Sequence, residues 1–242
     1  EVNLIDDYEK IKETLGVPFV LKSKKLGYDG YGNAVIKRKS DFIEGYKKLY
    51  PRCNALYAEK FVNFTKELAV SVVKNSYESL TYPVVETIQE NNICKKVIAP
   101  VEIDKSLIEE AKNTAIKCVD AIEGYGIYAL EMFLTEDNKI LVNEIAPRPH
   151  NSAHYTIDAC VTSQFENHIR AVLDLPLGST DMVKPYAVMI NMLGKKNGTG
   201  NLENYEEVLA EKDVHLHIYG KAESRIGRKM GHITIVGDNL QE

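Results

Sequence analysis

A predicted β-hairpin constrains the fold of this chain more than any other feature. Residues 127–134 and 140–145 are typical of strands, and Asp137-Asn138 between them is typical of a two-residue turn. Segments that favour helix and strand alternate along the rest of the chain, which predicts an α+β fold. We expect helices at about 5–15 and 40–49, from Ser106 to Gly124 behind a capping box, and at about 163–173.

The register of this hairpin brings two carboxylates together. A two-residue turn pairs Glu136 with Lys139, and counting outward places Glu131 directly opposite Glu144. Directly opposed side chains have Cβ atoms about 5 Å apart. The same count places four apolar residues on their face, namely Ala129, Phe133, Val142 and Ala146.

Like charges at this distance destabilise a sheet unless something offsets them. A divalent cation is the natural counter-charge, and hard carboxylate oxygens suit Mg2+. The alternative is two solvated glutamates on an exposed sheet face, and a slip of one residue in register would separate them. The pair Glu131 and Glu144 is therefore a candidate metal site that depends on register.

A polar loop follows the hairpin at once. Pro147 and Pro149 stiffen the chain around Arg148, and His150 and Asn151 come next. An arginine offers a planar fork of donors for phosphate or carboxylate. A plain surface turn is the alternative, but loops with this much chemistry usually carry function.

A glycine-rich loop follows a predicted strand that carries Lys22. Gly27, Gly30 and Gly32 let backbone N–H groups approach a phosphate closely, and Lys22 adds a positive charge. The spacing is that of neither a P-loop nor a dinucleotide-binding loop. An ordinary hairpin turn remains the alternative.

Two further segments have weaker signals. The backbone at 60–62 can bind an adenine as a strand edge binds a peptide, and Glu59 or Glu67 can accept hydrogen bonds from the ribose hydroxyls. The alternative is an ordinary strand. The tail places Lys221 and the basic run 225–232 between glycines, which suits one phosphate group or is a solvated charged surface.

Composition limits the classes of partner. The net charge of −5 argues against a general nucleic-acid binder, and no apolar run is long enough to span a bilayer. Cys53, Cys94, Cys118 and Cys160 have no zinc-site spacing, so we expect reduced thiols in a cytoplasmic protein. No signal peptide is evident, and because the sequence opens without Met we expect a fragment of a longer protein.

These motifs together resemble the N5-carboxyaminoimidazole ribonucleotide synthetase family of ATP-grasp enzymes, and most of all its fungal form, the ATPase portion of phosphoribosylaminoimidazole carboxylase. The run from Asn143 to Ser152, continuing to Thr156, is the most specific of them. Other matching stretches are 26–33, 57–61, 64–69, 82–89 and 227–232. They follow the family's order over nearly the whole chain.

The resemblance implies an ATP-grasp fold in which two α+β lobes, 1–55 and 56–175, clamp ATP, with a β-rich subdomain at 176–242. It implies that ATP and bicarbonate form carboxyphosphate, and that this intermediate, or the CO2 it releases, carboxylates 5-aminoimidazole ribonucleotide in purine biosynthesis. The implied cofactors are ATP and Mg2+. We expect no nucleic acid or membrane partner, and a homo-oligomer for the full-length protein.

The resemblance also assigns residues. The ATP phosphates fall to Lys22, Gly27, Tyr28, Asp29, Gly30, Gly32 and Asn33, and the adenine and ribose to Glu59, Lys60, Phe61, Val62 and Glu67. Glu131 and Glu144 bind Mg2+, with Asn143 beside them, and Arg148 meets bicarbonate or the phosphoryl group. The aminoimidazole nucleotide falls to Tyr28, Asp29, Arg148, His150, Asn151, Lys221 and Arg228.

Some features depart from the family pattern. Tyr31 stands where the loop usually has Arg, Ala153 where Gly is frequent, and Ile226 where Pro is common. The family's amino-terminal domain and the fungal mutase domain are absent from the sequence, so we expect this chain alone to bind ATP and turn over poorly. The alternatives are a sister formate-activating ligase of purine synthesis and a non-catalytic ATP-binding module.

Overall fold

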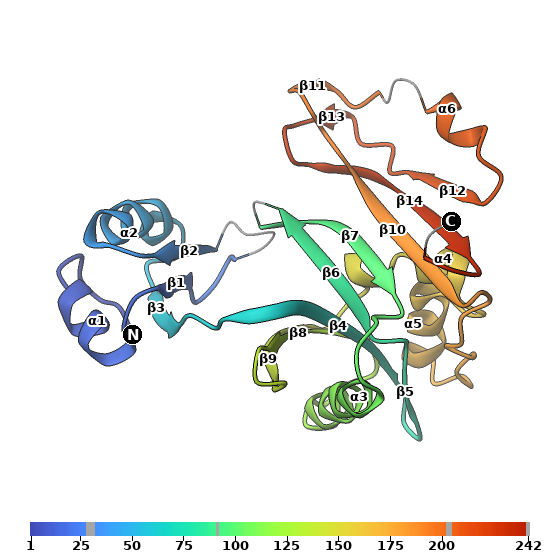
Figure 1. Cartoon of the computed structure of the whole chain (residues 1–242), viewed down its shortest axis with the longest axis horizontal. Coiled ribbons are helices and arrows are strands. Elements are labelled where there is room, and N and C mark those ends of the chain that lie inside the picture. Colours follow the sequence, from blue (N-terminus) through green and yellow to red (C-terminus); the bar gives the residue numbers. More distant parts are fainter. Residues whose placement is uncertain (28–31, 91, 202–204, 241–242) are drawn as a thin grey trace. The chain divides into compact units, whose positions relative to one another are not determined.

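The computed structural model describes residues 1–27, 32–90, 92–201 and 205–240. The chain divides into two compact units, Glu1–Asn63 with Asn91–Ile93, and Phe64–Glu90 with Cys94–Glu242. Both units combine helices with antiparallel strands, which confirms the α+β class (Figure 1). In the ranges described, no helix is both long enough and apolar enough to cross a bilayer.

The first unit is a three-stranded sheet, in the order β2-β1-β3, packed against two helices. Its elements are α1 (Tyr8–Leu15), β1 (Phe19–Ser23), β2 (Asn33–Ile36), α2 (Lys39–Cys53) and β3 (Leu56–Lys60). Phe19 and Leu21 of β1 are fully buried against Phe42 and Leu49 of α2. The helix predicted at about 5–15 spans Tyr8–Leu15 and is followed by Gly16, whose φ of 74° is one that glycine adopts without strain.

The second unit contains a nine-stranded sheet in the order β12-β14-β10-β7-β6-β4-β8-β9, with β5 paired to β4. Its strands are β4 (Phe64–Lys74), β5 (Ser79–Thr81), β6 (Val85–Glu90), β7 (Ile93–Ala99), β8 (Gly126–Thr135), β9 (Ile140–Ala146), β10 (Tyr186–Leu193), β12 (Val214–Ile218) and β14 (Lys229–Gly237). The short strands β11 (Gly198–Thr199) and β13 (Glu223–Ser224) pair with each other. The remaining elements are α3 (Lys105–Asp120), a 3-10 turn (Asn151–Ala153), α4 (Thr156–Ala159), α5 (Gln164–Val172) and α6 (Glu206–Leu209).

Alternation along β4 and β8 sorts their side chains onto two faces. Val70 and Leu130 pack with α3 in one core cluster, whereas Ala69 and Ile127 pack with Ala171 of α5 in another. Figure 1 shows α3 apart from α4 and α5. By the same alternation, Glu67 and Glu131 lie on the face that α3 does not cover.

The bounds of α3 correct one prediction. The helix begins at Lys105 after Asp104, with no side-chain cap, so Ser106 and Glu109 do not form the expected capping box. It also ends at Asp120, before Gly124. The apolar spacing identified the helix correctly, because Ala111, Ala115 and Val119 are fully buried. The predicted capping box and terminal glycine did not give its first and last residues.

Candidate functional site

The β8–β9 hairpin places Glu131 directly opposite Glu144, as predicted, but by a different route. The turn has one residue more than expected: Asn138 has a φ of 57°, and the Thr135 N–H donates to the Lys139 carbonyl oxygen at 3.0 Å. The predicted pairing of Glu136 with Lys139 is therefore wrong.

A bulge in β9 offsets that extra turn residue. The register shifts between Glu131 and Met132, so that Val142 faces Met132, and Asn143 is the additional residue. Val142 consequently leaves the face on which it was predicted, and Leu141 faces Phe133 instead. The bulge restores the opposition of the two glutamates and gives Asn143 its place beside them.

The carboxylates form a negatively charged, partly desolvated group. Burial, followed by the nearby Glu144 carboxylate, raises the pKa of Glu131 to about 7; Glu67 adds to the rise and Lys229 opposes it. Burial also raises the pKa of Glu67. Glu67, predicted to bind ribose, thus lies within electrostatic reach of the glutamate pair. A cation at this position would relieve the excess of negative charge.

The loop after β9 places a histidine near the glutamate pair. His150 Nε2 lies 3.8 Å from Glu131 Oε1, while His150 Nδ1 lies 2.9 Å from Ser152 Oγ. The exposed Arg148 donates one N–H to the Pro149 carbonyl oxygen at 3.0 Å. Both side chains therefore stand close to the predicted metal ligands in sequence, and His150 stands close to them in space.

Two buried amides, which the sequence did not reveal, fix this loop. Gln164 accepts from His150 N and donates to His150 O, both at 2.9 Å. Asn151 and Asn191 exchange two amide hydrogen bonds of 2.8 and 2.7 Å, and Asn191 also donates to Cys94 O. Only tertiary structure brings these partners together, because Gln164 opens α5 and Asn191 lies on β10.

The basic tail residues gather around one loop between β12 and β14. Lys221 Nζ donates to the Lys229 carbonyl oxygen, and Arg228 Nη1 donates to the Glu223 carbonyl oxygen, both at 2.6 Å. Lys229, which lies in the basic run predicted at 225–232, lowers the pKa of Glu131 by its charge. The start of β14 therefore links the basic loop to the glutamate pair.

The remaining candidates lie in the first unit. Lys22 and Glu59 form an ion pair with Nζ and Oε2 2.8 Å apart. Gly27 and Gly32 approach so closely that a Cβ on Gly32 would lie 2.4 Å from the Gly27 Cα. Asn33 begins β2 opposite Lys22, and Lys60 ends β3, followed by the half-buried Phe61 and Val62. Tyr28, Asp29 and Gly30 lie outside the described residues.

Comparison with known proteins gives two family matches. The ATP-grasp domain model matches residues 1–165, and the model of the phosphoribosylaminoimidazole carboxylase C-terminal domain matches residues 187–242. The predicted division into 1–55, 56–175 and 176–242 is a finer one and stays a prediction.

Curated relatives match over nearly the whole chain. The phosphoribosylaminoimidazole carboxylase of Candida albicans is 49% identical over 100% of this chain and 43% of its own length. The N5-carboxyaminoimidazole ribonucleotide synthase of Bacillus subtilis is 44% identical over 96% of this chain and 59% of its own. The chain thus spans less than two thirds of these relatives.

Solved structures match equally well. A carboxyaminoimidazole ribonucleotide synthase from Aspergillus clavatus complexed with ATP has a TM-score of 0.93 at 42% identity, covering 99% of this chain and 63% of that one. The enzyme of that organism in complex with ADP and 5-aminoimidazole ribonucleotide has a TM-score of 0.91 at 40% identity, covering 100% and 63%. The ATP-grasp fold predicted from the sequence is confirmed.

Proposed function

This chain belongs to the ATP-grasp family, among the phosphoribosylaminoimidazole carboxylases and N5-carboxyaminoimidazole ribonucleotide synthases, and we propose that it serves the ATP-dependent carboxylation of 5-aminoimidazole ribonucleotide. ATP phosphorylates bicarbonate and leaves as ADP. Carboxyphosphate then loses phosphate, either on attack by the amine or on release of CO2, and the amine takes up the carboxyl group. The observation that carries the proposal is the Glu131–Glu144 pair, with the loop that contains Arg148 and His150 next to it.

The glutamate pair fits Mg2+ by its chemistry. Both side chains offer hard oxygen donors. Burial, followed by the neighbouring Glu144 carboxylate, raises the pKa of Glu131, and a divalent cation would offset both effects. Glu131 and Glu144 would hold the ion, with Asn143 at the adjacent bulge. Bound there, Mg2+ would neutralise charge on the ATP phosphates.

The loop after β9 supplies orientation. Arg148 has five N–H donors in a planar fork, which suits bicarbonate or the transferred phosphoryl group. Gln164 and Asn191 hold the neighbouring backbone and the Asn151 amide in place before any substrate arrives. Such preorganisation lowers the barrier because the reacting groups need little rearrangement.

The two nucleotides fall to separate groups of residues. We assign the ATP phosphates to Lys22 and the 27–33 loop, and the adenine and ribose to residues 59–62 with Glu67. We assign the 5′-phosphate of the aminoimidazole nucleotide to Lys221 and Arg228. In the free chain these two cations donate to backbone carbonyl oxygens. A phosphate dianion competes well with a neutral carbonyl, because charge-assisted hydrogen bonds are the stronger ones.

We also propose that the protein works in the cytoplasm and that the full-length form is a homo-oligomer. The four cysteines are free thiols, which fits a reducing compartment. Size-exclusion chromatography with light scattering on the full-length protein would test the oligomeric state, and a monomer would overturn that part.

The test of the reaction is ADP release by the full-length protein with 5-aminoimidazole ribonucleotide, with and without bicarbonate. We expect release to depend on both compounds. Release that depends on formate instead would identify a sister ligase. ATP binding without ADP release under any combination would identify a non-catalytic module, and either result would overturn the proposal.

A further inference from the structure

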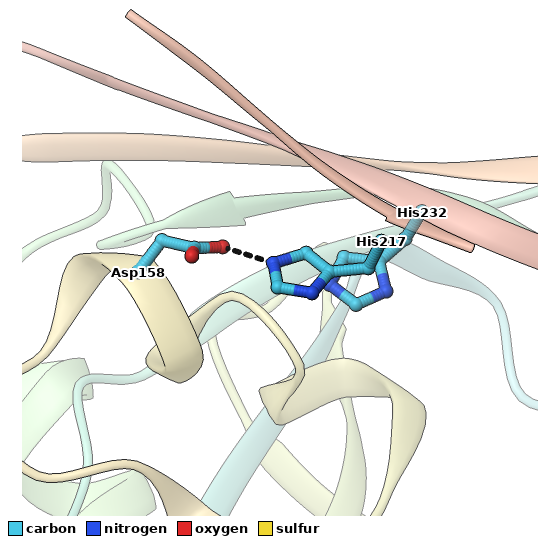
Figure 2. A group of neighbouring side chains, drawn as sticks. All are labelled: Asp158, His217 and His232. Atoms are coloured by element: carbon cyan, nitrogen blue, oxygen red, sulfur yellow. Dashed lines mark hydrogen bonds and ion pairs between the residues drawn. The ribbon is translucent and has the colours of Figure 1, made fainter. Parts of the chain in front are cut away.

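A cluster of potential metal ligands lies far along the sheet order from the glutamate pair. Asp158 of α4, His217 of β12 and His232 of β14 each offer one ligand atom, and these atoms all lie within 4.8 Å of one another (Figure 2). His217 and His232 are directly opposed in register, and their rings stack with centroids 4.4 Å apart. The two imidazoles thus come from neighbouring strands, and the carboxylate comes from a helix packed beside them.

Asp158 contacts two histidines of β12. His217 Nε2 lies 2.8 Å from Asp158 Oδ2, the contact drawn in Figure 2, and His215 Nδ1 lies 3.6 Å from Asp158 Oδ1. His215 and His217 are two residues apart on β12, so they share a face of the strand. The Asp158 side chain is only 10% exposed. One nearly buried carboxylate therefore faces several imidazoles.

Two buried polar atoms, one in this cluster and one beside it, have no hydrogen-bond partner among the residues that the structure describes. His232 is 1% exposed; its Nδ1 lies 2.8 Å from the Tyr219 hydroxyl, but its Nε2 has no hydrogen bond within the described part of the chain. The hydroxyl of Thr234, two residues along the same face of β14, is also buried without a partner. Buried polar atoms are almost always paired, so two such atoms on one face indicate a bound ion or water.

We propose that Asp158, His217 and His232 bind a divalent transition cation of the zinc class. Two imidazole nitrogens and one carboxylate oxygen suit Zn2+ and its neighbours, whereas Mg2+ prefers oxygen ligands. Zinc–nitrogen bonds of about 2.0–2.1 Å require the ligand atoms to move closer together by side-chain rotation. The metal replaces the Asp158–His217 hydrogen bond, and His215 or water takes the fourth position.

The bound cation has a structural role in this arrangement. It joins α4 to the paired strands β12 and β14, and its ligands Asp158 and His217 lie 59 positions apart in the sequence. Tyr219, through its hydroxyl on His232 Nδ1, orients that ring as an outer-shell partner does in known metal sites. Metal binding then stabilises the folded chain and does not require turnover.

The experiment is a titration of the untagged, chelator-treated full chain with Co2+, followed by visible absorption, and with Zn2+, followed by calorimetry. An excess of Mg2+ keeps the glutamate pair occupied throughout. We expect one cation per chain with the absorption of nitrogen- and oxygen-ligated tetrahedral Co2+, and a higher melting temperature with Zn2+. Each of His217→Ala, His232→Gln and Asp158→Asn should weaken binding at least about tenfold, since even an outer-shell loss costs about 10–100-fold.

His168→Gln is the matched control, because His168 lies on α5 outside the cluster and its Nδ1 accepts from Ile127 N. It should bind Zn2+ as the unchanged chain does. Circular dichroism and thermal unfolding without metal establish that each variant folds, and Asp158→Asn is nearly isosteric. Absence of binding at micromolar Zn2+, or binding that survives His217→Ala unchanged, would overturn the proposal.

Discussion

Opposed side-chain pairs of contrasting electrostatic character occupy the two ends of the nine-stranded sheet. Glu131 faces Glu144 across β8 and β9, and His217 faces His232 across β12 and β14. Burial and a neighbouring carboxylate raise the pKa of Glu131 to about 7, whereas burial and a neighbouring histidine lower the pKa of His232 to about 4. Burial thus disfavours the charged form in both pairs, on Glu131 in one and on His232 in the other.

The contrast shows that one geometric motif can favour different ions. Cross-strand opposition sets the separation of the donors in both pairs, and the donor atoms then decide which cation fits. Hard oxygens with excess negative charge favour Mg2+, and imidazole nitrogens with a single carboxylate favour a zinc-class ion. The following variants test this distinction, beginning with the largest expected effect.

Glu144→Ala should reduce turnover of the full-length protein on the order of a hundredfold or more, because metal ions supply several kcal/mol of charge stabilisation in such reactions. The fold should persist, since an exposed side chain is lost and a like-charge contact is relieved. Steady-state ADP release measures the effect. Glu136→Ala, in the exposed turn of the same hairpin, is the control and should remain active; normal activity of Glu144→Ala would end the assignment of the pair to Mg2+.

Gln164→Ala should lower the free energy of unfolding by about 2–4 kcal/mol, measured by urea denaturation. It leaves the backbone N–H of His150 without its partner, removes one of the two hydrogen bonds that His150 O accepts, and opens a cavity in a fully buried position. Gln164 Nε2 also lies 2.8 Å from His154 Nδ1, and the His154 ring packs against that of His232. This side chain therefore connects the surroundings of the two pairs.

Glu166→Ala on the same helix is the matched control for that variant. It removes an exposed ion pair with Arg170 and should change stability by less than about 1 kcal/mol. If Gln164→Ala proved as mild as Glu166→Ala, the loop after β9 would not depend on the buried amide.

The glutamate pair should make stability fall with rising pH when no metal is present. The folded-state pKa of Glu131 is raised from 4.5 to about 7, so the folded chain binds more protons between these values. The contribution of Glu131 to the free energy of unfolding is fully present below about pH 4.5. It is lost as pH rises through about 7, which lowers the free energy of unfolding by about 1–3 kcal/mol. Urea unfolding of the unchanged chain and of Glu131→Gln in chelator, at pH 5 and about pH 8, measures the difference. A slope that survives Glu131→Gln would assign it to other groups.

Sequence patterns predicted much of the fold and the composition of the glutamate site, but not its supports. Strand-typical residues at 127–134 and 140–145 identified β8 and β9. The opposition of Glu131 and Glu144 followed from hairpin counting, even though the observed turn is one residue longer and a bulge in β9 compensates for it. A bulge such as that at Asn143 has no local signal in the sequence. Gln164, Asn191 and the histidine cluster depend on contacts between distant segments, which periodicity cannot reveal.

The smallest expected effect concerns the histidine pair. Tyr219→Phe removes the hydroxyl beside His232 Nδ1 and should lower the free energy of unfolding by about 1 kcal/mol, since it deletes one partly buried hydrogen bond. Tyr125→Phe, at a 51% exposed position, is the control and should change it by less than about 0.5 kcal/mol. Because an outer-shell partner also orients a ligand, Tyr219→Phe should weaken Zn2+ binding about 10–100-fold. Mg2+-dependent turnover, measured on the same variant, shows whether the glutamate site is affected as well. Equal Zn2+ affinity in both variants would mean that the Tyr219 hydroxyl supports the fold alone.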